Sequence, residues 1–387
     1  MKKIAVFSGS RSEYGLLKNL LNQIQFSKYL DLNLIVVGSH LAKNYGTTIS
    51  EIKKDKIKIS KIIKFKYEKN MSGPKNISKN VLILISHLSI YLKRTLPDVL
   101  ILVGDRYETF IAAVTAVILK IKIVHIHGGE ITHGSKDDLY RHSISKMSDY
   151  HFVSTKFYKK RLKQLGENPS NIFNVGALCN DNIRKLEILD KTKVERILKT
   201  KFYKHNILVS YHPETSSKKK NLSEINEFLR SLSNLKSYKF FFSAPNADEN
   251  SEDIIKKIKL FCRKNKNTYY KTSYGNHLFL NLLIKCNLII GNSSSGIIEA
   301  PLIGCRSINL GKRQLGRIKS NLTLNCNINS NQIIKNIKKI LNIGNRKINI
   351  KKNPYYGFNV SNKIYLKLKN LDFSKKNYKK FYDVSFK

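Results

Sequence analysis

Short apolar runs alternate with longer segments whose apolar residues recur at helical spacing through the first half of the chain. We predict strands at the short runs and helices where apolar positions repeat every three or four residues. The expected strands are residues 4–7, 32–37, 59–65, 99–103, 123–126, 151–153 and 173–175. The expected helices are residues 13–24, 77–92, 107–119, 139–147 and 157–165.

The same alternation restarts after a break near residues 177–186. The expected strands are then 207–211, 238–243, 268–270, 288–290 and 307–310, and the expected helices are 186–199, 222–235, 252–264, 278–285, 296–302, 333–341 and 361–371. Strands that alternate with helices are typical of parallel sheets. We therefore predict an α/β protein with two Rossmann-like domains facing a cleft, residues 1–177 and 178–360. A C-terminal helix and tail, residues 361–387, is expected to pack back on the first domain.

The composition narrows the class of protein. Hydrophobic residues make up 41% of the chain, enough for ordinary cores. No apolar run approaches the ~20 residues that a membrane span needs. The run at residues 4–7 is also too short for a signal peptide. Five widely spaced cysteines without a Cys-x-x-Cys pair fit neither a disulfide framework nor a zinc site. We expect a cytoplasmic protein with no membrane partner.

The net charge of +44 raises the question of nucleic-acid binding. Lysine, asparagine and isoleucine are abundant throughout the chain, as an AT-rich coding sequence would produce. No RNP motif, zinc-finger spacing or clear helix-turn-helix pattern accompanies them. We therefore attribute the charge to composition and expect no nucleic-acid partner.

Charged and polar side chains gather where neighbouring strands of the first half are expected to end. They are Asp105 and Arg106 after one strand, His125, His127 and Glu130 at the next, and Asp137, Asp138, Arg141 and His142 at the start of a helix. Ligands of open α/β sheets bind at the carboxyl ends of the strands. Carboxylates and histidines gathered there indicate acid/base chemistry on a polar, anionic substrate.

Each of these clusters also has a structural interpretation. Asp105 is suited to cap the helix that follows, with Glu108 at capping-box spacing. If residues 123–126 are extended, His125 and His127 point to the same side, as a metal site would require. However, no third ligand completes a known spacing, so we expect no metal. Asp138 and Arg141 are spaced for an ion pair within one helix.

Several motifs indicate phosphate binding. The turn at residues 8–11 brings small residues and Arg11 to a helix start, but it is not a G-x-G-x-x-G fingerprint. Residues 291–296 read Gly-Asn-Ser-Ser-Ser-Gly and open a helix without a Walker A lysine. Glu299 lies nearby, where its carboxylate could accept both hydroxyls of a ribose. Arg313 and Arg317 follow the next strand.

The ordered motifs resemble those of the hydrolysing UDP-N-acetylglucosamine 2-epimerases, whose bacterial members feed sialic acid synthesis. The resemblance runs over nearly the whole chain and is strongest to the capsule-type enzymes. It is carried by residues 9–15, 104–108, 125–130, 141–147, 211–215, 291–296, 309–314 and 381–383. It implies a GT-B-like fold with UDP held mainly by the second domain. The implied reaction eliminates UDP to give 2-acetamidoglucal, and water then adds to give N-acetylmannosamine.

The resemblance also assigns roles to residues. Asp105 and Asp137 match acidic residues implicated in catalysis, and His212 matches a histidine near the pyrophosphate. His127 stands where many members have a catalytic glutamate, a difference shared by the capsule-type branch, and Glu130 is a candidate for part of that role. The positions implied to bind substrate or UDP are Arg11, Gly15, Arg106, Arg141, His142, Asn246, Ser293, Ser294, Glu299 and Arg313. The base and the acid among Asp105, His127 and Asp137 stay unassigned.

Other activities remain open at this point. A sister epimerase acts on nucleotide-linked diacetylbacillosamine in legionaminic acid synthesis and shares nearly all the motifs. Non-hydrolysing epimerases carry Glu-Ala-Gly-Leu-Arg where this chain has residues 127–131. A GT-B glycosyltransferase is a further alternative, and a nucleic-acid-binding protein is the non-enzymatic one. The epimerase mechanism needs no cofactor, and the family likeness leads us to expect a homodimer or homotetramer.

Overall fold

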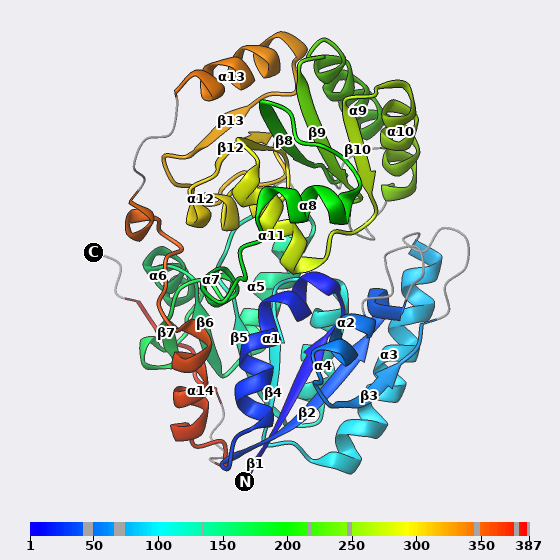
Figure 1. The fold of residues 1–387 in the computed structure, drawn as a ribbon. Coiled ribbons are helices and arrows are strands. Elements are labelled where there is room, and N and C mark those ends of the chain that lie inside the picture. Colours follow the sequence, from blue (N-terminus) through cyan, green and yellow to red (C-terminus); the bar gives the residue numbers. More distant parts are fainter. Residues whose placement is uncertain are drawn as a thin grey trace. The chain divides into compact units, whose positions relative to one another are not determined.

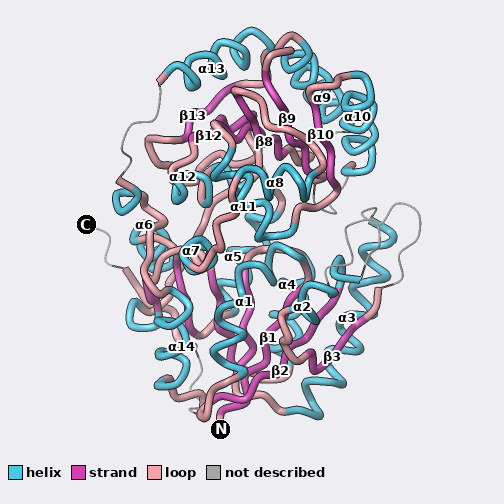
Figure 2. Tube along the Cα trace, in the orientation of Figure 1, coloured by secondary structure: helices cyan, strands magenta, loops and turns pink. Residues whose placement is uncertain are grey.

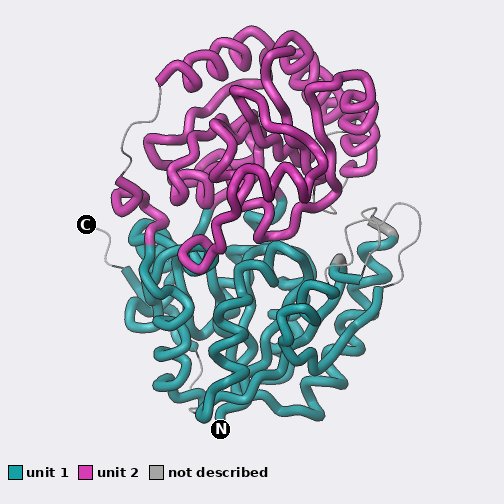
Figure 3. Tube along the Cα trace, viewed as in Figure 1, with its two compact units in different colours: residues 1–130, 136–182, 357–387 teal, residues 131–135, 183–356 magenta. Residues whose placement is uncertain are grey.

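The computed structural model describes residues 1–41, 49–65, 74–133, 135–214, 218–245, 250–343, 349–374 and 379–384. Helices and strands alternate along most of the chain (Figures 1 and 2). The chain divides into two compact units (Figure 3). Unit 1 comprises residues 1–130, 136–182 and 357–387, and unit 2 comprises residues 131–135 and 183–356.

Unit 1 is built on a seven-stranded sheet in which every pairing is parallel. Its order is β3-β2-β1-β4-β5-β6-β7. The strands are β1 (Lys2–Ser8), β2 (Leu30–Val37), β3 (Ile59–Ile63), β4 (Val99–Val103), β5 (Lys122–Ile126), β6 (Tyr150–Val153) and β7 (Ile172–Asn174). The buried, apolar β4 shows why such strands form, since a parallel sheet is covered on both faces.

Helices pack on both faces of this sheet. They are α1 (Arg11–Gln25), α2 (Ile49–Lys54), α3 (Pro74–Thr95), α4 (Tyr107–Ile118), α5 (Asp137–Met147), α6 (Lys156–Gln164) and α14 (Val360–Asn370). Leu17, Leu20 and Ile364 of α1 and α14 share one core cluster with the sheet. Leu84 and Ala112 of α3 and α4 pack in the cluster that contains the alternate residues of β1. The late helix α14 therefore completes the first unit.

Unit 2 repeats the design with a six-stranded parallel sheet of order β10-β9-β8-β11-β12-β13. Its strands are β8 (His205–Ser210), β9 (Tyr238–Ser243), β10 (Thr268–Lys271), β11 (Leu288–Gly291), β12 (Arg306–Leu310) and β13 (Thr323–Cys326). Its helices are α8 (Lys191–Leu198), α9 (Lys218–Ser233), α10 (Ser251–Lys264), α11 (Gly275–Lys285), α12 (Glu299–Ile303) and α13 (Ser330–Asn342). Within α7 (Cys179–Arg184) the chain passes from unit 1 to unit 2.

Strand order reverses once in each sheet, and this locates the candidate sites. In unit 1 the reversal falls between β1 and β4, and in unit 2 between β8 and β11. Ligands of open α/β sheets bind at such points, beyond the carboxyl ends of the strands. The segments that follow these strands are residues 9–11 and 104–106 in unit 1, and residues 211–214 and 292–296 in unit 2. All of them were singled out by their sequence.

The predicted α/β class with two parallel sheets is confirmed, and the differences are local. The predicted helix at 186–199 is shorter, because Asp190 caps α8 through a side chain that accepts from the Lys193 amide. The predicted helix at 296–302 is a 3-10 turn at Ser294–Gly296 followed by α12. The strand β13 was missed because its Thr-Leu-Asn-Cys sequence has no apolar run.

Candidate active site

The end of β4 presents Asp105 to a guanidinium and not to a helix start. Arg106 is the residue that precedes α4, and its side chain makes no capping hydrogen bond there. Asp105 instead accepts a hydrogen bond from Arg141 Nη2. The interpretation of Asp105 as a helix cap is therefore wrong, and so is the capping role of Glu108, which accepts from Arg106 Nε at 3.2 Å. A charged donor binds a carboxylate more strongly than a backbone amide does.

Arg141 brings three of the predicted segments together in unit 1. Its side chain is 1% exposed. Nη1 lies 2.7 Å from Asp138 Oδ1 and 3.0 Å from the carbonyl oxygen of Glu130, while Nη2 reaches Asp105. The predicted Asp138–Arg141 ion pair is confirmed. A buried guanidinium needs several oxygen partners, and these contacts supply them.

The first turn of α5 adds further ionisable groups to this cluster. Asp137 is the first residue of the helix, so its charge complements the helix dipole. His142 Nε2 lies 3.7 Å from Asp138 Oδ2. The Asp105 side chain is 25% exposed, whereas Arg141 is buried beneath it. This carboxylate is therefore held in place and still reachable from outside.

His127 and His125 do not share a side of the strand, contrary to expectation. The extended backbone of β5 ends at Ile126, and His127 has a φ of +66°. Its Nε2 accepts from the Leu178 amide at 3.2 Å, and its Nδ1 lies 3.4 Å from Glu130 Oε1. Both ring nitrogens of His125 have other partners. A non-glycine residue in this backbone region stores strain, which concentrates at functional sites.

Glu130 is buried beside His127 and has a second partner. Its exposed fraction is 2%, and Oε1 accepts from Ser154 Oγ at 2.9 Å. Because Nε2 of His127 accepts an amide N–H, the proton of a neutral ring sits on Nδ1 and points at Glu130. The two side chains thus form a close pair of ionisable groups.

The turn after β1 contains an ionisable residue, Glu13, that is not among the predicted site residues. Ser10 caps α1, and its side chain accepts from the Glu13 amide. Glu13 is 5% exposed, and its carboxylate accepts from the Gly9 amide at 2.6 Å. Burial raises the pKa of Glu13 to about 7. The Ser-x-x-Glu spacing at a helix start was the available signal.

Two predicted binding residues lie on the same helix. Arg11 is the first residue of α1, where burial lowers its pKa and the nearby Glu51 opposes that shift. The carbonyl oxygen of Gly15 accepts from Asn182 Nδ2 at 2.6 Å. The structure therefore places Arg11 at the carboxyl end of β1, and Gly15 one turn further along.

In unit 2, Asn292 joins the two segments at the reversal of strand order. It is 0% exposed, and it binds both backbone groups of His212, accepting from N at 2.6 Å and donating to O at 2.8 Å. The backbone carbonyl oxygen of Asn292 accepts from Arg313 Nη1 at 3.2 Å and from Gln314 Nε2 at 3.1 Å. His212 and Arg313 are thus fixed around one buried amide.

Glu214 holds the loop that carries Arg313. Its Oε1 accepts from the amides of Lys312 at 2.9 Å and Arg313 at 3.0 Å. Gly311 has a φ of +67°, and a Cβ there would lie 2.8 Å from the same oxygen. The glycine is therefore required for the loop to close over Glu214.

The serine-rich turn follows β11. Ser293 caps the 3-10 turn, accepting from the Ser295 amide at 3.4 Å, and Ser294 is the first residue of that turn. Burial raises the pKa of Glu299, opposed by Ser295 and Arg317. Hydroxyls and amides at a helical turn are a common phosphate cradle. Asn246, also predicted to bind ligand, lies outside the described residues.

Within the described residues, no group of three or more His, Cys, Asp or Glu side chains is arranged to hold a metal ion. No described helix is both long and apolar enough to cross a membrane.

The sequence of this chain is similar to those of known proteins. The model of the UDP-N-acetylglucosamine 2-epimerase family matches residues 22–369. The chain is 38% identical to the GDP/UDP-N,N'-diacetylbacillosamine 2-epimerase (hydrolyzing) of Campylobacter jejuni, with 85% of each protein covered. It is 34% identical to polysialic acid biosynthesis protein P7 of Escherichia coli, with 99% of this chain and 98% of that protein covered.

A solved structure agrees on the fold. The UDP-GlcNAc 2-epimerase of Neisseria meningitidis, bound to UDP-GlcNAc, matches 95% of this chain and 99% of its own with a TM-score of 0.76 at 18% identity. The sequence motifs, the two parallel sheets and the family match agree, and the chain belongs to the UDP-N-acetylglucosamine 2-epimerase family.

Proposed function

We propose that this protein is a hydrolysing 2-epimerase that converts UDP-N-acetylglucosamine and water into N-acetylmannosamine and UDP, for sialic acid synthesis. The observation that carries the proposal is the Asp105–Arg141 pair at the reversal point of unit 1. Arg141 also binds the backbone of Glu130, so a fixed, partly exposed carboxylate and the segment of the His127–Glu130 pair share one buried partner. Such groups suit proton removal from a weakly acidic carbon.

The reaction proceeds in two balanced steps. A base removes the C2 proton while the bond between C1 and the UDP oxygen breaks, which leaves 2-acetamidoglucal and UDP. Water then adds across the double bond, its hydroxyl to C1 and a proton to the opposite face of C2. We assign the base role to Asp105, because the lone pair of His127 Nε2 is occupied by the Leu178 amide. Asp137 and Glu130 are the candidates to return the proton, because both ring nitrogens of His127 already face protein groups.

Unit 2 supplies the nucleotide contacts in this proposal. Arg313, Ser293 and Ser294 bind the diphosphate, whose charge grows as UDP leaves, and Glu299 accepts the ribose hydroxyls. His212 lies near the pyrophosphate. Fixed donors aimed at developing charge lower the barrier of the elimination. The serine turn and the Asn292-anchored arginine support these roles.

A second candidate substrate is nucleotide-linked N,N'-diacetylbacillosamine. It is favoured by the 38% identity to the Campylobacter jejuni enzyme. The product would then enter legionaminic acid synthesis. Both substrates undergo the same chemistry at C1 and C2, so the proposed roles of the residues do not change.

NMR of the purified protein with UDP-N-acetylglucosamine in D₂O tests the proposal. We expect free N-acetylmannosamine with deuterium at C2, together with UDP. The same assay with UDP- and GDP-diacetylbacillosamine identifies the alternative substrate. Epimerised sugar still attached to UDP would indicate the non-hydrolysing reaction, and three unchanged substrates would overturn the epimerase assignment.

A further inference from the structure

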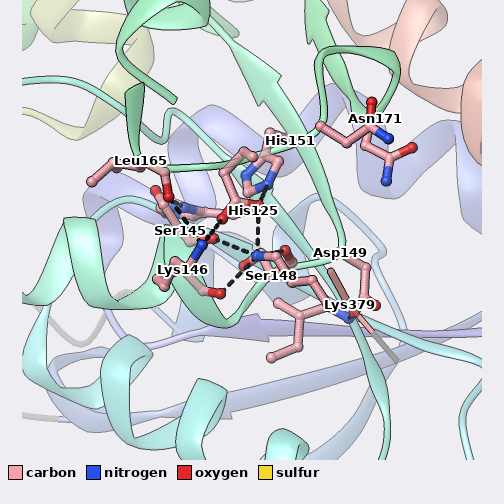
Figure 4. Close-up of polar contacts among 12 residues, drawn as sticks. His125, Ser145, Lys146, Ser148, Asp149, His151, Leu165, Asn171 and Lys379 are labelled. Carbon is pink, nitrogen blue, oxygen red and sulfur yellow. Dashed lines mark hydrogen bonds and ion pairs between the residues drawn. The ribbon is translucent and has the colours of Figure 1, made fainter. Parts of the chain in front are cut away.

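His125 is buried and makes two hydrogen bonds within unit 1. It is 0% exposed, its Nε2 lies 2.8 Å from the Gly104 carbonyl oxygen, and its Nδ1 lies 3.0 Å from Ser145 Oγ. Figure 4 shows His125 beside Ser145 among the polar contacts of this region. A carbonyl oxygen only accepts, so Nε2 carries the proton, and Nδ1 of the neutral ring accepts from the Ser145 hydroxyl. Burial lowers the pKa of His125 to about 3, which keeps the ring neutral.

Gly128 rests directly on the His125–Ser145 hydrogen bond. A Cβ at this glycine would lie 2.8 Å from His125 Nδ1 and 2.8 Å from Ser145 Oγ. Gly128 is not among the glycines with positive φ, so backbone conformation does not require it. The requirement for glycine here comes from the close approach of the chain to this hydrogen bond.

The three groups that meet at His125 belong to three segments of the candidate site. Gly104 directly precedes Asp105, and Gly128 lies between His127 and Glu130. Ser145 lies one turn after Arg141 on α5. One imidazole therefore contacts the residue before Asp105, the residue after His127 and the helix that carries Arg141.

We propose that His125 is a positioning residue that holds these three segments in register for proton transfer at C2. The inference rests on the proposed function. His125 itself does not exchange protons with the substrate, since both ring nitrogens are engaged with protein groups. A displacement of about 1 Å at a reacting group lowers a rate by about 100-fold, so the loss of such an anchor reaches the chemical step.

Variants that remove one or both hydrogen bonds of the His125 ring test this inference. His125→Gln keeps an N–H donor near the Nε2 position, whereas His125→Leu removes both hydrogen bonds. We expect His125→Leu to lower kcat about 10–100-fold and His125→Gln to recover most of it. The Kd for UDP should change less than about threefold, because the proposed contacts to the diphosphate and ribose lie mainly in unit 2. His87→Leu on α3, where the ring is exposed, is the matched control.

Gly128→Ala provides an independent perturbation, since it removes no polar group and only adds a methyl at the bond. It should lower kcat in the same way, and the pH profile of kcat/KM should keep its shape in every variant. A wild-type kcat in His125→Leu or Gly128→Ala would overturn the inference. The loss of one limb of the pH profile in His125→Gln would also overturn the inference, because it would show that His125 itself acts as an acid or base.

The failure of the proposed function gives a different result. Wild-type protein that turns over no nucleotide sugar contradicts that function and this inference together. Active wild type with equally active anchor variants contradicts the inference alone. A lower melting temperature with unchanged kcat in these variants would show that His125 only stabilises the fold, and would also overturn the inference.

Discussion

Arg141 binds the carboxylate of Asp105 from 36 residues further along the chain, and its side chain is 1% exposed. The pair joins the end of β4 to the middle of α5. Asp105 is thereby aligned by a rigid, buried partner, while part of its own side chain stays exposed. The contact is made entirely by protein groups, as the base role proposed for Asp105 requires.

Asp105→Asn should abolish most turnover, because the amide cannot take the C2 proton. We expect kcat to fall about 100- to 10,000-fold, the usual contribution of a positioned base. Deuterium incorporation at C2, followed by NMR, should fall by the same factor, while UDP binding by calorimetry stays unchanged. The substitution Asp98→Asn, before β4, provides a control carboxylate outside the site. Substantial C2 exchange in Asp105→Asn would move the base to another residue.

Glu214→Ala should weaken UDP binding, because the carboxylate holds the backbone amides of Lys312 and Arg313. Removing a charged acceptor of backbone amides costs about 1.5–3 kcal/mol, or roughly 10–100-fold in Kd if all of it reaches the ligand. Glu214→Gln retains an acceptor oxygen and should lose less. Calorimetric titration with UDP measures both variants. Equal affinity in Glu214→Ala and wild type would remove this loop from the nucleotide site.

Glu13 should make the stability of the protein depend on pH near neutrality. Its pKa is raised from 4.5 to about 7 in the folded protein, where it faces Arg106, Glu108 and the Gly9 amide. The folded state therefore binds more protons than the unfolded state between these values, so stability falls as pH rises from about 4.5 and levels off above about 7. The full effect is at most about 3 kcal/mol.

Glu13→Gln removes that titration. Urea unfolding of the two proteins between pH 4.5 and pH 8 should show the wild type losing stability relative to the variant as pH rises. The glutamine variant should be the more stable protein at pH 8. A stability difference that does not change with pH would mean that Glu13 titrates alike in both states.

Lys379→Met should destabilise unit 1, because this lysine closes the C-terminal end of α5. Its Nζ lies 2.6 Å from the carbonyl oxygens of Lys146 and Ser148 (Figure 4). The same nitrogen lies 2.5 Å from Glu167 Oε2. The last carbonyls of a helix lack partners within the helix and favour a cation. We expect a loss of about 1–2 kcal/mol in unfolding free energy. Lys380→Met, at an exposed neighbour, should behave as wild type, and equal stability of both variants would contradict the assignment.

Much of the fold follows from the sequence, since a strand such as β4 is apolar throughout and helices carry a periodic apolar face. The positions of the polar clusters follow too, because the carboxyl ends of parallel strands meet at one edge. One error concerns a partner that is distant in sequence. Asp105 has the local signature of a helix cap, and nothing nearby in sequence reveals that Arg141 takes its carboxylate. His125 and His127 were expected on one side because an extended backbone was assumed through His127. The strand β5 instead ends at Ile126, and His127 has a positive φ. Glu13 was overlooked because burial, which raises its pKa, depends on the packing of the whole unit.

The discontinuous units determine how this protein can be recombined with its relatives. Residues 131–135 belong to unit 2 although they interrupt unit 1, and the chain returns to unit 1 at Gly357. A single crossover after α7 would therefore give a chimera whose C-terminal helix and 131–135 segment come from the wrong parent. An exchange of unit 2 needs three junctions besides the one at residues 182–183, at 130–131, 135–136 and 356–357.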